Sequence, residues 1–306
     1  MSPSTLRIGG YGPEKSAHGA GLAAFRDYVV SATDGELEID VTWNIMDDGR
    51  PNTDLFDLVE SGEMFLCYFS SSYLGDRVNE LDVLETPFLF ADLDSAHHSL
   101  DGPLGERLRQ AVRDRTGFEA LGFWDNGFRH MTNRLHPIHT PEDCRGMTVR
   151  VQPNAIHEEL ISCWGAEPMA VELSEGVSLI SSGTVDAQEN PLANTVAYGV
   201  HQVHPYVTMT GHLYGARGLF ANRDVYESLP VDLRDVVDSG VRTAIIDQRA
   251  LAAELEDTLR RDLEAAGVDF VDLTIEERDA FRQASGPAIE KARAGVPVDL
   301  FDLVEP

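Results

Sequence analysis

Three polar side chains in this 306-residue chain have the chemistry of an anion-binding site. Arg129 follows a segment predicted to be a strand, Arg150 ends a second such segment, and Asn190 closes a third. A guanidinium is a planar fork that binds a carboxylate through two parallel hydrogen bonds. The amide of Asn190 could add a hydrogen bond to the same anion. For each arginine taken singly, the alternative is a surface ion pair.

The elements that would position these residues alternate along the chain. The first part has the order strand, helix, strand, helix, strand, and Leu22, Phe25 and Val29 form one face of its first helix. That order predicts an α/β fold with a mostly parallel sheet and helices on both faces. The alternation restarts near Ala120. The expected strands cover residues 5–9, 37–43, 64–69, 120–124, 147–151, 169–173 and 184–189, and the expected helices include 55–59, 154–164 and 174–182.

The same pattern predicts two α/β lobes. After Pro230 a helical pattern runs to about Ala266, far beyond the average helix of about 11 residues, so we expect it to span both lobes. Pro287 should break or kink the last helix. Ligands of open α/β sheets gather at the carboxyl ends of strands, where the two arginines and Asn190 are expected. We assign residues 1–124 and 213–250 to lobe I, and residues 125–212 and 251–306, with the C-terminal helices, to lobe II, with hinge strands near 124–126 and 209–212.

The charge balance argues against several kinds of partner. Lys and Arg number 24 against 52 Asp and Glu, which gives a net charge of −28. A field of that sign repels nucleic-acid phosphates and anionic lipid head groups, so we expect no nucleic-acid or membrane-surface binding. An anionic ligand must therefore be held by local arginines against the overall field.

Sequence motifs for bond-making chemistry are absent. A dinucleotide loop starting at Gly10 fails because its third glycine position holds Lys15. His157-Glu158 begins like a metalloprotease helix, but the second histidine position holds Ile161. The sequence also contains no phosphate-binding G-x-x-x-x-G-K-[ST] loop and no G-x-S-x-G nucleophile elbow. We therefore expect no enzymatic activity and no cofactor.

The histidines and cysteines show no ligand spacing for a metal. We expect surface or capping histidines and no metal site, because no carboxylate or thiol completes a ligand set around His97, His98, His201, His204 or His212. Cys67, Cys144 and Cys163 are expected to be small buried residues, with one disulfide as the alternative. No apolar run approaches the roughly 20 residues that cross a bilayer, and the first ten residues lack the features of a secretory leader. These features fit either a cytosolic protein or one whose leader has been removed.

A series of short runs then makes the chain recognisable. They are TPFLF at 86–90, NGFRHMTN at 126–133, PIHTPED at 137–143, GMTVRV at 146–151, GAEPM at 165–169, GTVDAQENP at 183–191 and TGH at 210–212. In their order and spacing these runs resemble the extracytoplasmic solute-binding proteins of TRAP transporters, the DctP-type family. The similarity extends from about Leu6 past Val237, and the run at 183–191 is the most specific.

The resemblance implies a two-lobed periplasmic-binding-protein fold of the type II-like kind, which closes on an organic anion. In that family the arginine matching Arg150 makes the carboxylate salt bridge, and the residues matching Arg129 and Asn190 assist. Four further positions match sites that line the family's pocket, and each of them either contacts the ligand or packs in the core. These are Tyr11, Ser70, Leu173 and Tyr214.

The resemblance also narrows the ligand and the partner. Ser70 stands where several members have a glutamate that receives an amino group, and a buried unpaired ammonium is costly, so a cationic ligand is disfavoured. We expect a C4-dicarboxylate, a hydroxy acid or a sugar acid. The expected partners are the membrane permease subunits of a TRAP transporter, and the expected location is periplasmic, with the leader removed. We expect the protein to be a monomer.

Two other functions stay open at this point. The chain could be a ligand-sensing subunit that passes closure to a signalling partner. It could also be an α/β enzyme acting on a carboxylic acid, which would need a general base beside the arginines. His130 and Glu189 are the candidates for that base.

Overall fold

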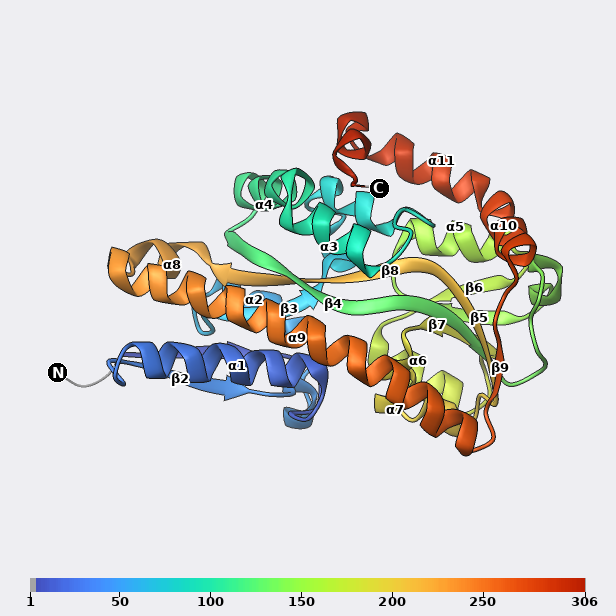
Figure 1. The fold of residues 1–306 in the computed structure, drawn as a ribbon, viewed down its shortest axis with the longest axis horizontal. Helices are drawn as coiled ribbons and strands as arrows, with labels where there is room; N and C mark the ends of the chain where they lie inside the picture. The colour runs from blue at the N-terminus through green and yellow to red at the C-terminus, as the bar shows by residue number, and fades with distance from the viewer. Residues whose placement is uncertain (1–3, 306) are drawn as a thin grey trace. The chain divides into compact units, whose positions relative to one another are not determined.

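The computed structural model describes residues 4–305 as an alternation of strands and helices (Figure 1). The strands are β1 (Ser4–Gly9), β2 (Leu37–Thr42), β3 (Leu66–Ser70), β4 (Phe118–Asn133), β5 (Thr148–Val151), β6 (Glu167–Ala170), β7 (Ala187–Asn190), β8 (Tyr206–Asn222) and β9 (Asp269–Val271). The α-helices are α1 (Ala17–Ala32), α2 (Asp54–Glu60), α3 (Leu93–Asp101), α4 (Pro103–Arg115), α5 (Ala155–Cys163), α6 (Leu173–Ser181), α7 (Leu192–Ala197), α8 (Arg223–Ser228), α9 (Val231–Ala265), α10 (Ile275–Ala284) and α11 (Gly286–Gly295). The predicted α/β class is confirmed.

Side-chain caps determine where several of these helices begin. The Oγ of Ser16 accepts the N–H of Gly19 at the start of α1, at 3.0 Å. Asn154 caps α5 by accepting the N–H of Ile156 at 2.8 Å. Each cap satisfies a backbone N–H that the first turn of a helix leaves unpaired. The cap on α5 therefore ends the short connection from β5, the strand that carries Arg150.

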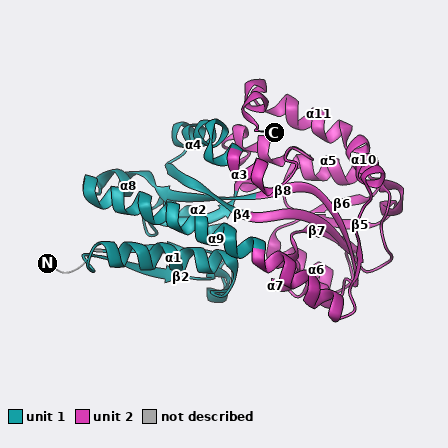
Figure 2. Ribbon diagram, in the orientation of Figure 1, with its two compact units in different colours: residues 1–70, 99–125, 216–253 teal, residues 71–98, 126–215, 254–306 magenta. Residues whose placement is uncertain are grey.

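The chain divides into two compact units (Figure 2). Unit 1 comprises Met1–Ser70, Ser99–Asp125 and Ala216–Ala253, and unit 2 comprises Ser71–His98, Asn126–Gly215 and Glu254–Pro306. β4, β8 and α9 each continue from one unit into the other. The long helix predicted after Pro230 is confirmed as α9.

One segment differs from the division expected from the sequence, which placed all of 1–124 in lobe I. Ser71–His98 belongs to unit 2. Within it, the 3-10 helix η3 (Asn79–Glu85) packs against α11, and Asn79 Nδ2 donates a hydrogen bond to the carbonyl oxygen of Gly295 at 2.8 Å. Phe88 joins an apolar core of unit 2. The hydrogen bond from Asn79 to Gly295 joins residues 216 apart in the sequence, and a local pattern carries no signal of such a contact.

Unit 1 is a mixed sheet with helices packed on it. Its strand order is β2-β1-β3-β8-β4, in which β1 runs parallel to β2 and β3, and β3 runs antiparallel to β8. A Cβ atom on Gly21 of α1 would lie 2.7 Å from the ring of Trp124 in β4, so the helix lies directly on the strand. Ser70 is the last residue of β3, and Tyr11 follows β1 by two residues. Both predicted site residues of unit 1 thus lie at carboxyl ends of parallel strands.

In unit 2 the strand order of the sheet is β8-β4-β7-β5-β6, and β9 pairs with β8. β5 runs parallel to β6 and β7, and β4 runs antiparallel to β7. Trp164, Phe281 and Ala288 belong to one buried apolar cluster beneath these strands. The sheet places Arg150 in β5 and makes Asn190 the last residue of β7.

The expected boundaries were wrong at two places near the site. The strand expected at 120–124 continues as β4 to Asn133, so Arg129 lies inside a strand and not beyond its end. Asn126 and Gly127 resemble a turn, but Gly127 takes a φ of 93° within the strand, and pairing with β7 continues across 130–133. The strand expected at 169–173 ends at Ala170, and Leu173 begins α6.

The C-terminal part contains one confirmed break and no candidate membrane helix. α10 ends at Ala284, and α11 begins at Gly286 with Pro287 in its first turn, where proline's missing N–H costs nothing. Across residues 4–305, none of the helices combines the length and the apolar character needed to cross a bilayer.

Candidate ligand-binding site

Arg150 is a buried cation without a carboxylate partner. Arg150 lies in β5, and 2% of its surface is exposed. Nη2 donates a hydrogen bond to the carbonyl oxygen of Val171 at 2.9 Å, and Nε is buried with no hydrogen-bond partner. Among the described residues, no acidic side chain forms an ion pair with this guanidinium. Burial lowers the pKa of Arg150, but a guanidinium stays charged in proteins, so the cation is buried without an ion-pair partner, and Glu189 acts on it only as a nearby charge.

Helix α6 holds the stem of this arginine. A Cβ atom on Gly176 would lie 2.6 Å from Arg150 Nε and 3.1 Å from its Cγ and Cδ. Leu173, the first residue of α6, is buried two residues after the carbonyl that Arg150 binds. These neighbours are glycine, apolar side chain and backbone. They position the guanidinium without neutralising it.

Arg129 is equally buried, but Glu189 neutralises its charge. Nε of Arg129 binds one carboxylate oxygen of Glu189, and Nη2 donates to the other at 2.7 Å. Nη2 also donates to the backbone carbonyl of Glu189 at 2.7 Å. Nη1 makes no hydrogen bond in the described part of the chain, so any bond from this arginine to a ligand would come from Nη1. The two predicted arginines therefore differ: one is paired within the protein and the other is not.

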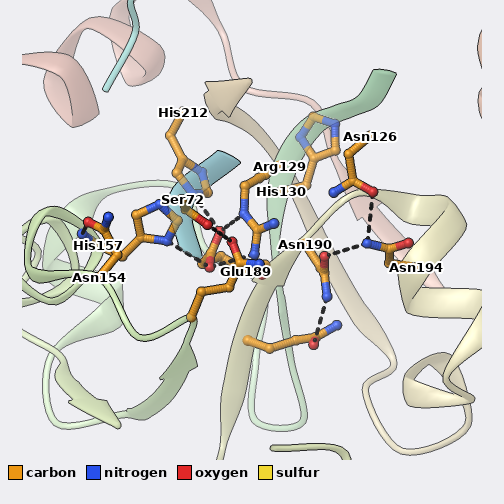
Figure 3. A network of polar contacts seen from close by, with 12 residues as sticks. Ser72, Asn126, Arg129, His130, Asn154, His157, Glu189, Asn190, Asn194 and His212 are labelled. Carbon is orange, nitrogen blue, oxygen red and sulfur yellow. Dashed lines mark hydrogen bonds and ion pairs between the residues drawn. The ribbon is translucent and has the colours of Figure 1, made fainter. Parts of the chain in front are cut away.

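Glu189 is the centre of a buried charged cluster (Figure 3). Nδ1 of His157 and Nε2 of His212 lie 3.6 and 3.5 Å from its two carboxylate oxygens. The other nitrogen of His157 is hydrogen-bonded to Glu85 at 2.7 Å. The Oγ1 of Thr210 lies 2.7 Å from Nδ1 of His212 and orients that ring. The cluster joins β4, α5, β7 and β8 of unit 2.

In this cluster, interactions with charged partners shift the pKa values of Glu189 and His157 more than burial does. Burial alone would raise the pKa of Glu189, but Arg129 and the nearby rings of His157 and His212 hold it well below its usual range. Burial alone would lower the pKa of His157, but the nearby Glu189 carboxylate and the hydrogen bond to Glu85 raise it to about 9. His157 is therefore an imidazolium at neutral pH. Its charge and that of Arg129 are matched by the two carboxylates of Glu189 and Glu85.

The raised pKa of His157 predicts a loss of stability in alkaline solution. The folded value of about 9 lies above the unfolded value of about 6.5, so the stabilisation is complete below pH 6.5 and is lost as pH rises through 9. Between pH 7 and pH 9 we expect the free energy of unfolding to fall by about 2–3 kcal/mol. Urea unfolding at both pH values measures this fall. In His157→Gln it should shrink to under about 1 kcal/mol, and an unchanged fall would contradict the assignment.

Asn190 belongs to a row of buried amides (Figure 3). Nδ2 of Asn194 lies 3.0 Å from Oδ1 of Asn190 and 3.1 Å from Oδ1 of Asn126. Nδ2 of Asn190 donates to Gln188 at 3.4 Å, which leaves it a second N–H. Nδ2 of Asn126 is buried with no hydrogen-bond partner. The row thus ends in an unused amide donor on Asn126, which the sequence did not single out.

The other predicted residues fall in different environments. Tyr214 of β8 is buried with its ring edge-on to Phe90 and Phe128, at centroid distances of 5.5 and 5.7 Å. Tyr11 is also buried, and its backbone N–H donates to the Oη of Tyr68 at 3.2 Å. The predicted site residues in unit 2 are Arg129, Arg150, Leu173, Asn190 and Tyr214, and those in unit 1 are Tyr11 and Ser70.

The histidine prediction was wrong in part, and the prediction of small buried cysteines is confirmed for Cys67 and Cys144 but not for Cys163. His204 and His212 are fully buried, not on the surface, because each hydrogen-bonds to a threonine hydroxyl within the sheet. The cysteines are free, with Cys67 and Cys144 buried and Cys163 partly buried. No group of three or more His, Cys, Asp or Glu side chains within residues 4–305 is arranged to hold a metal ion.

Comparison with known proteins identifies the family of this chain. The family model of the bacterial extracellular solute-binding proteins, family 7 (DctP), matches residues 8–294. The chain belongs to this family. A solute-binding protein of Verminephrobacter eiseniae is 30% identical over 88% of this chain and 79% of its own length. The C4-dicarboxylate-binding periplasmic protein DctP of Rhodobacter capsulatus is 26% identical over 94% of this chain and 86% of its own.

Solved structures extend the match to the fold of family 7. The sugar acid binding protein of Advenella mimigardefordensis, in complex with galactonate, has a TM-score of 0.93 at 26% identity and covers 99% of this chain and 98% of its own. A TRAP periplasmic solute-binding protein of Sulfurospirillum deleyianum with bound succinate has a TM-score of 0.91 at 26% identity and covers 99% of both chains. The predicted binding-protein fold is thus confirmed, and each of these two solved structures contains a bound organic acid.

Sequence reasoning missed part of the polar architecture of this family 7 chain. Glu189 was considered only as a catalytic base, yet it is the partner of Arg129. His157 was dismissed with a failed metal motif, yet it lies between two carboxylates.

Proposed function

We propose that this chain is the substrate receptor of a TRAP transporter and that it binds the carboxylate of a small organic acid on Arg150. The observation that carries the proposal is the charge state of the site. Arg150 is buried, charged and without an acidic partner, which is costly in a ligand-free protein. A ligand carboxylate offsets that cost by accepting a bidentate pair of hydrogen bonds.

The neighbouring groups have supporting roles in this proposal. Glu189 fixes Arg129 so that its free Nη1 can donate to the same carboxylate. The second N–H of Asn190 is a further donor. Leu173 supplies an apolar wall, and no cofactor is needed. Relatives bind galactonate and succinate, which supports an organic acid of the sugar-acid, hydroxy-acid or C4-dicarboxylate class.

Transport follows from a change in the arrangement of the two units. The chain passes between them in β4, β8 and α9, where the backbone can act as a hinge. A ligand that has more contacts in a closed state shifts the population toward that state. The closed receptor then delivers the acid to the membrane permease, outside the cytoplasmic membrane. We expect the receptor to act as a monomer.

Enzymatic turnover is disfavoured because both candidate bases are already engaged. Glu189 is an ion-paired carboxylate whose pKa is held low, so it is a poor proton acceptor. His130 accepts the N–H of Gly211 on Nδ1 at 3.1 Å, and burial lowers its pKa to about 3. The proposal therefore includes release of the acid unchanged.

A thermal-shift screen tests the proposed function. The protein is heated with sugar acids, hydroxy acids and C4-dicarboxylates, and with the neutral amide of each acid as the matched control. A ligand at 100 times its Kd adds about 2.7 kcal/mol, which raises the melting temperature by roughly 5–10 °C. We expect this from one class of acids and from none of the amides. NMR of the released ligand should find it intact. Absence of a shift with every acid would refute the proposal.

Gly176→Ala should weaken binding without unfolding the protein. The new methyl group would meet Nε of Arg150 at 2.6 Å and displace the guanidinium. Alanine within α6 adds about 1 kcal/mol of helix propensity, so the ligand-free melting temperature should not fall. We expect a Kd about 10-fold higher, measured by calorimetry, since a buried charged contact is geometrically demanding. Equal affinity would show that the position of Arg150 does not limit binding.

A further inference from the structure

Arg217 is a buried cation of unit 1. It lies in the part of β8 that belongs to this unit, opposite Ser70 in the register with β3, and is 3% exposed. Nε and Nη1 are buried with no hydrogen-bond partner, and Arg217 forms no ion pair among residues 4–305. Its Cζ lies 5.6 Å from the centroid of the Tyr11 ring, a cation–π distance that leaves these nitrogens unused. A guanidinium keeps its proton in a protein, so no side chain of the described chain neutralises this charge.

A further unused donor lies on the same face of the sheet in unit 1. Nε1 of Trp124 in β4 is buried without a partner, and β4 is next to β8 in the strand order. The Tyr68 ring lies 5.6 Å from the Trp124 ring and 5.2 Å from the Tyr11 ring, measured between centroids. Because side chains alternate along a strand, Tyr68 shares a face with Ser70 and with Arg217 opposite it. The unused nitrogens of Arg217 and Trp124 therefore belong to one aromatic cluster.

The unused buried nitrogens of unit 1 are concentrated in this cluster. Within its described residues they occur on His18, Trp124, Arg217, Arg234 and Arg249. Arg234 and Arg249 use other nitrogens of their guanidinium groups in hydrogen bonds. Arg217 makes no hydrogen bond in the described part of the chain. An unsatisfied buried charge is costly, so this arginine needs an anion that the fold of unit 1 does not supply.

The groups around the cluster add positive rather than negative potential. His18, in the first turn of α1, stacks on Tyr68 at a centroid distance of 4.9 Å, and burial together with Arg217 lowers its pKa to about 3, so it is neutral. That first turn contains no acidic residue, and the N-terminus of a helix carries partial positive charge. Asp125 follows Trp124 in β4, so its side chain points to the opposite face of the strand.

We propose that unit 1 binds a small monovalent inorganic anion, of which chloride is the probe, on Arg217 and Trp124. One negative charge balances the one guanidinium, and the buried N–H groups donate to it. Water could accept the same hydrogen bonds but would leave the charge unbalanced. A divalent oxyanion would bring an excess negative charge into a site walled by aromatic rings. The site uses no group of unit 2, so the inference goes beyond the proposed function and does not depend on it.

Chloride-dependent stability in an Arg150→Gln parent tests this inference. The parent lacks the other buried guanidinium without an ion pair, which could itself attract chloride when no acid is bound. Its melting temperature is measured with increasing sodium chloride at constant ionic strength, with sodium fluoride as the replacement salt, because fluoride holds its hydration shell too strongly for a partly apolar site. Above the Kd, each tenfold increase in chloride should raise the melting temperature by about 3–5 °C.

Variants in the same parent assign the effect to the cluster. In Arg217→Gln the dependence on chloride should disappear. Arg7→Gln makes the same charge change at an exposed position of unit 1 and should keep it. Trp124→Phe keeps an aromatic ring but removes one donor, so the apparent Kd for chloride should rise about 3- to 10-fold. This last variant tests the site even if Arg217→Gln folds poorly.

Bromide locates the ion and completes the test. Crystals of the wild type grown with bromide should give an anomalous-scattering peak in contact with the guanidinium of Arg217. A peak there without chloride-dependent stability would mean an adventitious ion only, and the inference would be wrong. It would also be wrong if Arg217→Gln kept the dependence, or if an organic acid but not chloride stabilised the parent. The proposed function is untouched by these outcomes, because it depends on acid binding to Arg150 in the wild type.

Discussion

Arg150→Gln should abolish acid binding while leaving the ligand-free protein at least as stable as wild type. Truncating one partner of a buried charge pair costs about 2–5 kcal/mol, which corresponds to a Kd roughly 30- to several-thousand-fold higher. The free protein gains because the unpaired guanidinium is removed from its interior. Calorimetry with the best acid measures the first effect, and urea unfolding without ligand measures the second.

The combination of these two effects is what identifies a ligand anchor. A structural arginine would lose stability on substitution, as a paired residue does. Arg145→Gln is the matched control, because Arg145 is exposed in unit 2 and the variant makes the same change in net charge. It should alter neither property by a measurable amount. An Arg150→Gln protein that keeps wild-type affinity would show that the carboxylate binds elsewhere.

Glu189→Gln is expected to be among the most destabilising single substitutions of the charged residues in unit 2. The carboxylate holds the buried cations Arg129 and His157, and its loss leaves Arg129 with no acidic partner. Breaking a buried pair by removing one partner costs about 3–5 kcal/mol, against the 5–15 kcal/mol that stabilises a typical domain. The free energy of unfolding from urea titration at pH 7 measures the loss.

A control variant and the pH dependence of stability distinguish the role of Glu189 from a general effect of removing a carboxylate. Glu290→Gln changes an exposed glutamate of α11 and should cost less than about 0.5 kcal/mol. In Glu189→Gln, His157 loses one of its two carboxylates, so its pKa should fall and the alkaline loss of stability should shift to lower pH. A destabilisation no larger than that of Glu290→Gln would contradict a central role for Glu189.

The local order of strands and helices was predictable because it depends on short-range patterns. Leu22, Phe25 and Val29 recur at helical spacing, and the residues 37–42 alternate as one strand does, so α1 and β2 appear in the sequence as they do in the structure. Pro287 separates α10 from α11 for an equally local reason. The boundaries failed where local signals competed, as at Gly127, where a turn-like pair of residues lies inside a strand that β7 holds in place.

The α/β class, the resemblance to the DctP-type family and the candidate anchor Arg150 depend on residue types and their spacing, so they could be inferred without a structure. Which charges are compensated depends on how the chain folds. In the sequence, Arg129 and Arg150 are similar candidates for binding an anion. In the structure, Arg129 forms an ion pair with Glu189, 60 residues away, and Arg150 does not. The physical reason is that burial and pairing depend on contacts between distant segments, which the folded chain creates and which no local pattern contains.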